Sequence, residues 1–205
     1  MKFTFKKLFF ITIAALFMTS AVMNIIEKSE IEQGISSKVV RFHIRAESNS
    51  EYDQKLKLLV RDDVLAEAES ILAQCKTREE CLEVLSENIE IIEKAAQESV
   101  HKNGGNAEVT AEIKKEIFPL KTYGNITFPA GQYTALVIEI GGGKGRNWWC
   151  VMFPKLCFVE ESVVKGENTE KQLSLILSED EYDEVMRNND FEIGFKFAEI
   201  IGSIF

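Results

Sequence analysis

The folded part of this chain is expected to begin with Lys38-Val39-Val40-Arg41-Phe42-His43-Ile44-Arg45-Ala46. Every second residue from Val40 to Ala46 is apolar, and Arg41, His43 and Arg45 lie between them. A period of two is typical of a β-strand with one buried face. The sequence therefore predicts a strand over residues 38–46, with His43 on its more exposed face.

Two amphipathic helices are predicted to follow this strand. Over residues 51–74, and again over residues 78–101, apolar residues recur at three- and four-residue steps, which places them on one stripe of each helix. Ser50 is a candidate N-cap for the first helix, and Thr77 with Glu80 forms a capping box for the second. We expect the two helices to form an αα-hairpin that packs against a sheet.

Two further segments have the pattern of strands. Residues 108–117 alternate, so that four apolar residues are expected to face inward, namely Val109, Ala111, Ile113 and Ile117. Residues 133–140 are apolar and β-branched, which suits a central strand. These segments supply the rest of the predicted sheet.

The C-terminal part is predicted to be helical. Ser178 and Glu181 form a capping box for a helix that ends near residue 188, and residues 191–205 carry apolar side chains in helical register. We expect this tail to dock on the domain rather than to bind a membrane or a partner. The predicted fold is α+β: an αα-hairpin packed on a small, mainly antiparallel sheet, followed by C-terminal helices.

The first residues have the pattern of an export segment. Lys2, Lys6 and Lys7 precede an apolar run over residues 8–26, and the nearest cleavage signal, Thr19-Ser20-Ala21, is poor. A buried core helix is a weaker interpretation, because a helix that is apolar on every side and has basic residues only at its start is uncommon in a soluble domain. We therefore expect a signal peptide or signal anchor at residues 1–26, a tether at residues 27–37, and a single domain over residues 38–205.

The charge of the remaining chain excludes one class of partner. Without Lys2, Lys6 and Lys7, 21 basic residues stand against 33 acidic residues. Nucleic-acid binding requires a basic face that neutralises phosphates, and the sequence contains no basic patch. We expect no nucleic acid as a partner, and contact with a membrane only through the N-terminal segment.

The four cysteines fall into two local pairs, Cys75 with Cys81 and Cys150 with Cys157. In an oxidising compartment such pairs are usually disulfides, and local pairing is favoured, although the sequence allows three connectivities. Zinc is disfavoured because the spacings are wide and the chain has 2 histidines. We expect no metal, no cofactor and no small-molecule substrate.

The run Trp148-Trp149-Cys150-Val151-Met152-Phe153-Pro154-Lys155-Leu156-Cys157-Phe158 is rich in aromatic residues around a cysteine pair. A core strand with a stapled corner and an aromatic contact surface are both open interpretations, because tryptophan and phenylalanine serve both purposes. The preceding Gly141-Gly142-Gly143-Lys144-Gly145 lacks a phosphate-loop pattern and is expected to be a turn.

Several segments resemble the stage II sporulation protein R family of endospore-forming bacteria. They are Val40-Arg41-Phe42-His43-Ile44 with Asn49-Ser50, Lys55-Leu56-Lys57 to Val60-Arg61-Asp62, Phe128-Pro129-Ala130-Gly131 with Tyr133, and above all Gly145-Arg146-Asn147-Trp148-Trp149-Cys150-Val151 to Phe153-Pro154 and Leu156-Cys157-Phe158. The resemblance extends from residue 38 to residue 158 and includes the export segment. Lys155 stands where the family usually has a second proline.

The resemblance implies a non-enzymatic signal that is made in the forespore and exported into the space between the forespore and mother-cell membranes. There it would activate a membrane-bound aspartic protease of the mother cell, which processes pro-sigma-E. We expect the contact residues, or their support, to be Arg146, Asn147, Trp148, Trp149, Phe153, Pro154 and Phe158, with a Cys150–Cys157 bridge holding the loop.

Two other hypotheses remain open from the sequence. One is a secreted cysteine hydrolase of cell-wall peptides, with Cys150 as the nucleophile and His43 or His101 as the base. The other is a structural factor that is tethered to the membrane and uses its uncleaved anchor and the apolar tail.

Overall fold

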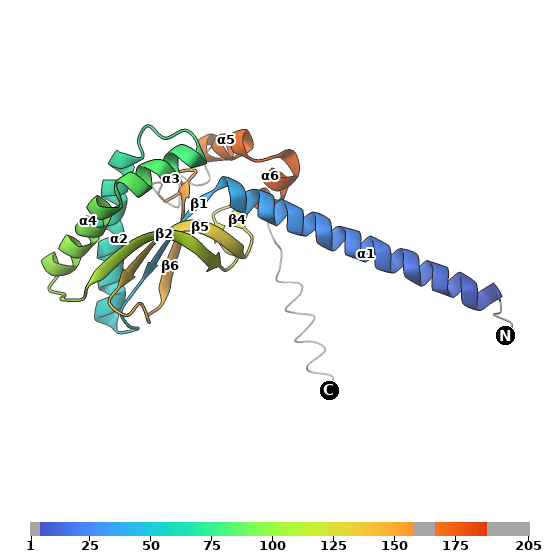
Figure 1. Cartoon of the computed structure of the whole chain (residues 1–205), viewed down its shortest axis with the longest axis horizontal. Helices are drawn as coiled ribbons and strands as arrows, with labels where there is room; N and C mark the ends of the chain where they lie inside the picture. Colours follow the sequence, from blue (N-terminus) through green and yellow to red (C-terminus); the bar gives the residue numbers. More distant parts are fainter. Residues whose placement is uncertain (1–4, 158–166, 188–205) are drawn as a thin grey trace.

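A computed structural model describes residues 5–157 and 167–187 of the chain (Figure 1). The elements in chain order are α1 (Phe5–Lys38), β1 (Val40–Arg45), α2 (Glu51–Ile71), α3 (Arg78–Glu87), α4 (Ile89–Lys102), β2 (Val109–Phe118), β3 (Lys121–Tyr123), β4 (Ile126–Phe128), β5 (Gly131–Ile140), β6 (Asn147–Phe153), α5 (Glu167–Ile176) and α6 (Glu179–Met186).

The main sheet has four strands in the order β2-β5-β1-β6, and β3 with β4 forms a separate hairpin. Strand β1 runs parallel to β5 and antiparallel to β6, while β2 pairs antiparallel with β5. The α+β prediction with a mainly antiparallel sheet is confirmed, and the segment predicted as central is β5, one of the two inner strands.

One face of the sheet is covered by the helical layer of α2, α3 and α4, which Figure 1 shows on one side of the strands. The predicted caps hold the helix starts: the Ser50 side chain accepts a hydrogen bond from the Asp53 backbone, and Thr77 and Glu80 form the capping box of α3. The single helix predicted over residues 78–101 is two helices, because the Asn88 side chain donates to the Val84 carbonyl and ends the first.

The opposite face of the sheet carries a second core, so the prediction that His43 lies on an exposed face is wrong. His43 and Arg41 are both completely buried. The β3–β4 hairpin, the end of α1, and the helices α5 and α6 cover this face and bury apolar residues such as Phe128 and Leu173. A strand covered on both faces loses the exposure that its alternating sequence suggests.

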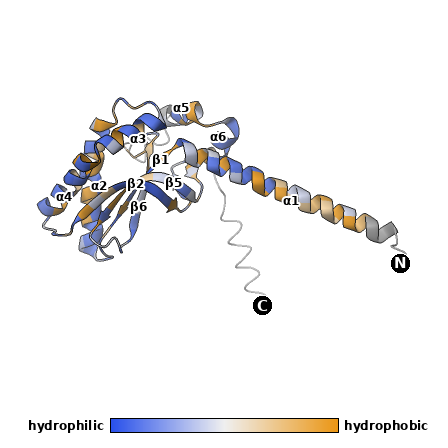
Figure 2. Ribbon diagram, in the orientation of Figure 1, coloured by the Kyte–Doolittle hydropathy of each residue, from blue (hydrophilic) through white to orange (hydrophobic). Residues whose placement is uncertain are grey.

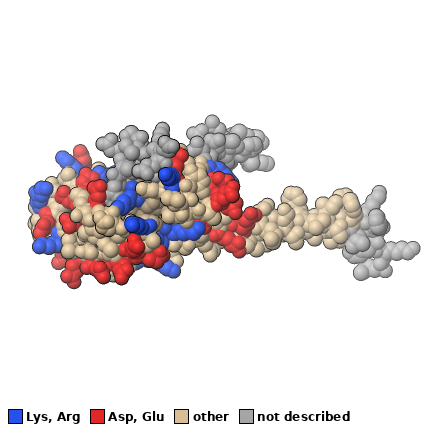
Figure 3. All heavy atoms as spheres, turned by 90° about the horizontal axis from the view of Figure 1, so that it is seen from above, with Lys and Arg blue, Asp and Glu red and all other residues tan. Residues whose placement is uncertain are grey.

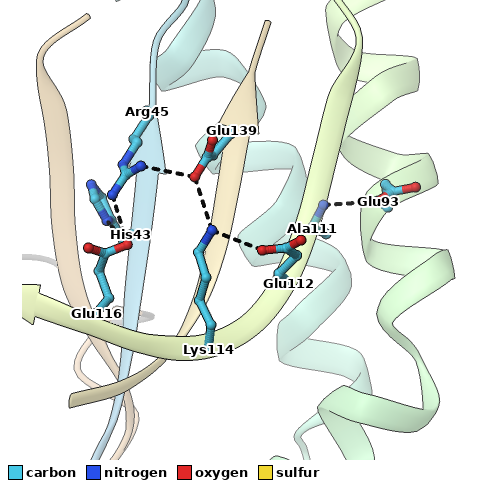
Figure 4. Close-up of polar contacts among 8 residues, drawn as sticks. All are labelled: His43, Arg45, Glu93, Ala111, Glu112, Lys114, Glu116 and Glu139. Carbon is cyan, nitrogen blue, oxygen red and sulfur yellow. Dashed lines mark hydrogen bonds and ion pairs between the residues drawn. The ribbon is translucent and has the colours of Figure 1, made fainter. Parts of the chain in front are cut away.

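Beyond this cover, the rest of the same face is polar (Figure 4). Arg45 pairs with Glu116 at 2.7 Å and with Glu139 at 2.9 Å, and Lys114 pairs with Glu139 at 3.1 Å and with Glu112 at 2.9 Å. These ion pairs lie where none of the described helices covers the strands.

Helix α1 extends away from the domain, and its apolar part is exposed (Figures 1 and 2). By length and composition, this helix is the one among the described residues that meets the criteria for a membrane span. Figure 3 shows acidic side chains gathered where this apolar arm joins the domain. The helix is compatible with a signal peptide or a membrane anchor.

Residues 27–37 are not the unpacked tether that their polar sequence suggests. They continue α1, and Ile35 is completely buried in the second core. Lys38 donates to Glu181 of α6 at 2.5 Å, and a Cβ on Gly34 would collide with the Glu181 carboxylate. Contacts with α6, which lies far away in the sequence, therefore order this segment.

The inward pattern predicted for β2 holds at its start and fails at its end. Val109 and Ala111 are buried, whereas Ile117 is 72% exposed and Phe118 is buried instead. The helix predicted after Ser178 is confirmed with its capping box. The docked tail predicted over residues 191–205 lies outside the described residues.

Candidate partner-binding site

Strand β6 carries the aromatic motif and forms one edge of the sheet. Adjacent residues of a strand point to opposite faces, so Trp148 and Trp149 do not form one surface. Trp148 faces the helical layer, where its ring meets Phe42 edge-to-face at 5.6 Å. Trp149 faces the second core, where it stacks on His43 at 3.6 Å and meets Phe118 at 4.6 Å.

Trp148 lies at a corner that three segments of the chain build together. The Arg61 guanidinium, from α2, is 5.1 Å from the centre of the Trp148 ring. The Arg146 backbone N–H donates to the Asn49 side chain at 2.7 Å, and its carbonyl accepts from the Lys57 amine at 2.9 Å. We call Asn49, Lys57, Arg61, Arg146 and Trp148 the Trp148 corner.

Gly145 allows these segments to approach one another. Its backbone N–H donates to the Ala46 carbonyl at 2.8 Å, and a Cβ at this position would collide with the Ser48 carbonyl. Backbone contacts at Gly145 therefore add to the two side-chain hydrogen bonds, from Asn49 and Lys57, that hold Arg146.

The Trp148 corner concentrates positive charge on an acidic protein. Lys57 is buried, and burial lowers the pKa of its amine. The positive charges of Arg146 and Arg61 lower this pKa further. Arg146 and Asn147 are exposed, and Trp148 is half-buried. Arg146, Asn147 and Trp148 were predicted from the sequence as contact residues. Lys57 and Arg61 were not, although both lie in a segment that carries the family resemblance.

The turn after β6 supports this strand. Cys150 and Cys157 are joined by a disulfide with their Cα atoms 5.6 Å apart, and the Phe153-Pro154 peptide bond is cis. Phe153 and Pro154 are buried, so they belong to the supporting structure rather than to a contact surface. Phe158 lies outside the described residues.

The other predicted bridge is absent from the structure, in which Cys75 and Cys81 are unbonded. Cys81 lies in the first turn of α3 and is buried in the helical layer, while Cys75 is half-buried in the loop before it. Burial raises the pKa of the Cys81 thiol to about 12, and raises that of Cys75 as well.

The geometry does not support the cysteine hydrolase hypothesis. The Cys150 sulfur is part of the disulfide, and Cys150 faces the helical layer, whereas His43 lies in the second core. Burial lowers the pKa of His43 to about 4, with the charges of Arg45 and Lys114 acting in the same direction. His101 is exposed at the end of α4. In residues 5–157 and 167–187, no cluster of three potential metal ligands is found.

The role of Arg41, whose side chain donates a hydrogen bond to the backbone of β6, was not predicted from the sequence. Its Nε donates to the Cys150 carbonyl at 3.0 Å and its Nη2 donates to the Tyr123 hydroxyl at 3.2 Å, while that hydroxyl donates to the Trp149 carbonyl at 3.1 Å. The guanidinium also lies 4.4 Å from the centre of the Phe118 ring. The signal in the sequence that could have indicated this role is the position of Arg41 within a segment of β-branched and aromatic residues.

The fold and the site define a class: an α+β domain carried on a long N-terminal apolar helix, with a fixed aromatic and basic corner at one sheet edge. Residues 36–163 match the family model described as Stage II sporulation protein R. The chain belongs to the stage II sporulation protein R family.

One relative is the protein named Stage II sporulation protein R of Bacillus subtilis (strain 168), which is 38% identical over 138 residues. The match covers 67% of this chain and 61% of the relative, so the chain spans less than two thirds of that protein's length. No solved structure matches the chain.

Proposed function

We propose that this chain is a signalling protein of endospore formation that acts outside the cytoplasm, in the space between the forespore and mother-cell membranes. It binds the extracytoplasmic part of a membrane-bound aspartic protease and thereby activates the processing of pro-sigma-E. Membership of the stage II sporulation protein R family supports the sporulation role, and the apolar helix α1 supports export.

The Trp148 corner is the observation that favours a binding function. Tryptophan and arginine are enriched at the residues that contribute most to protein–protein affinity. Here a half-buried tryptophan lies beneath Arg61, and the backbone of Arg146 is held at both its N–H and its carbonyl. Because the corner is already ordered, binding requires little loss of conformational entropy.

Activation further requires that the protein binds the active form of the protease more tightly than the inactive form. Equal affinity for both forms would leave the equilibrium unchanged. We propose that the Trp148 corner makes the contact that differs between the two forms.

Substitution at the corner tests this proposal. Trp148→Ala and Arg146→Ala should each lower the rate of pro-sigma-E processing about tenfold or more in sporulating cells that carry no other copy of the protein. The matched control is Ile91→Ala, which truncates an apolar side chain that is 49% exposed on α4.

Thermal unfolding of the purified variants separates a loss of contact from a loss of fold. If folded Trp148→Ala protein supports processing at the rate of the control, the contact surface lies elsewhere.

A further inference from the structure

The two edges of the sheet differ in how their backbone groups are satisfied. On β6, two outward carbonyls already have partners: the Trp149 carbonyl accepts from the Tyr123 hydroxyl at 3.1 Å, and the Val151 carbonyl accepts from the Cys157 N–H at 3.0 Å. Capping of this kind protects an edge strand from pairing with another chain.

On β2, the first half of the edge is capped in a similar way. The Val109 N–H donates to the Gln97 side chain at 2.9 Å, and the Ala111 N–H donates to the Glu93 carboxylate at 2.8 Å (Figure 4). Both caps come from α4, and the hydrogen bonds from α4 extend along β2 only as far as Ala111.

The second half of the β2 edge is open. The register with β5 continues without interruption from Val109 to Phe118. In an antiparallel ladder the outward groups recur at every second residue, so Ile113, Lys115 and Ile117 point their N–H and C=O groups away from β5. Within the described part of the chain, these groups have no hydrogen-bond partner.

The side chains along this open half indicate what it can bind. Ile117 is 72% exposed, and Lys115 is exposed beside a groove of about 580 Å³ between β2, β5 and α1. Lys114 is neutralised by Glu112 and Glu139, whereas Lys115 forms no ion pair with the described residues. The edge therefore presents one unpaired cation between two isoleucines.

We propose that residues 113–117 of β2 form a docking edge for an extended segment of a partner protein, which adds a strand to the sheet. Such strand addition gains affinity from main-chain hydrogen bonds and specificity from alternate side chains. The segment that fits has an acidic residue beside Lys115 and apolar residues beside Ile113 and Ile117.

A second copy of this chain fits the edge poorly. Two-fold pairing that used all three outward residues would place Lys115 beside its own copy, and like charges directly opposite one another are destabilising. The inference rests on the proposed function in one respect, that the extended segment belongs to the membrane-bound aspartic protease. The docking edge on β2 and the Trp148 corner on β6 are at opposite edges of the sheet, so they can be tested separately.

Amide hydrogen exchange tests the docking edge. The full chain in detergent micelles is measured alone and with the purified membrane-bound aspartic protease. We expect the N–H groups of Ile113, Lys115 and Ile117 to exchange rapidly in the free protein and about tenfold or more slowly in the complex. The capped N–H of Ala111 serves as the internal reference.

Two variants accompany this measurement. Lys115→Glu should weaken binding of the protease about tenfold, because it replaces an attraction by a repulsion. Its matched control is Lys94→Glu, at a lysine that is 77% exposed on α4. Lys115→Pro removes one outward N–H without removing a bond to β5, and it should also weaken binding.

The outcomes distinguish the two proposals. If the wild-type chain does not bind the protease, the proposed function and the docking edge both fail. If it binds without slower exchange at residues 113–117, and Lys115→Glu binds like Lys94→Glu, the docking edge alone is wrong. Protection of the edge that rises with concentration in the absence of the protease would overturn the partner segment in favour of a second copy.

Discussion

Arg41 is a buried cation that forms no ion pair with any described carboxylate. Substitution by another cation should therefore destabilise the protein more than substitution by an apolar side chain. Its guanidinium is completely buried, and its pKa is lowered by burial while Tyr123 and Tyr133 act in the opposite direction. We predict that Arg41→Met is tolerated better than Arg41→Lys, although lysine retains the charge.

The magnitudes follow from the contacts of the guanidinium. Arg41→Met removes two hydrogen bonds from a charged donor, which contribute about 1.5–3 kcal/mol each, and the attraction to the rings of Phe118, Tyr133 and Phe128 at 4.4, 4.9 and 5.3 Å, about 2 kcal/mol. It also removes the desolvation penalty of a buried ion, which is several kcal/mol. The expected net loss is about 1–3 kcal/mol.

Arg41→Lys keeps the desolvation penalty but loses the planar donor pair that reaches both the Cys150 carbonyl and the Tyr123 hydroxyl. A buried lysine can instead lose its proton. This costs about 1.4 kcal/mol for each pH unit by which the ambient pH lies below the ordinary pKa of lysine, or about 5 kcal/mol at neutral pH. We expect a loss of about 3–5 kcal/mol for this variant.

Urea unfolding at neutral pH, followed by tryptophan fluorescence, measures both changes, because both tryptophans of the chain lie on β6. The reasoning is refuted if Arg41→Lys unfolds at the same urea concentration as the wild type, or at a higher one than Arg41→Met.

Three further predictions concern histidine and cysteine. Unfolded His43 takes up a proton near its ordinary pKa, whereas burial lowers the pKa of folded His43 to about 4. The free energy of unfolding should therefore fall by up to about 3 kcal/mol as the pH drops from 6.5 to 4. His43→Phe should lose this part of the pH dependence, and an equal dependence in both proteins would contradict the prediction. Replacing Cys150 and Cys157 together by serine removes a bridge that closes a loop with a sequence separation of 7. The unfolded chain then gains conformational entropy, which should lower the free energy of unfolding by about 2.5 kcal/mol. An unchanged urea midpoint would contradict this prediction. Alkylation of the native protein should not modify Cys81, because its thiol is buried. After denaturation without reduction, both Cys75 and Cys81 should be alkylated. An intact mass that shows no alkylation under this condition would indicate a second bridge instead.

Local patterns in the sequence were sufficient for most of the elements. The capping boxes at Thr77 and Ser178 mark the starts of α3 and α6, because a cap involves only residues within one helical turn. The alternation of β1 and the apolar content of β5 likewise predicted two neighbouring strands of the sheet.

The errors arose where distant segments act. The sequence of residues 27–37 is polar, yet α6 orders its end through Lys38 and Glu181. Ile117 completes an alternating pattern, yet it is exposed because the helical layer does not extend over the end of β2.

The candidate site divides in the same way. Sequence alone determined the fold class, the N-terminal apolar segment, the aromatic motif and the family resemblance, since each depends on residue types at fixed spacing. Only the tertiary structure decided that Trp148 and Trp149 face opposite sides, that Arg61 and Lys57 join Arg146, and that the second half of β2 is open. These features depend on which elements cover which face of the sheet, and that choice is made by packing between residues far apart in the chain.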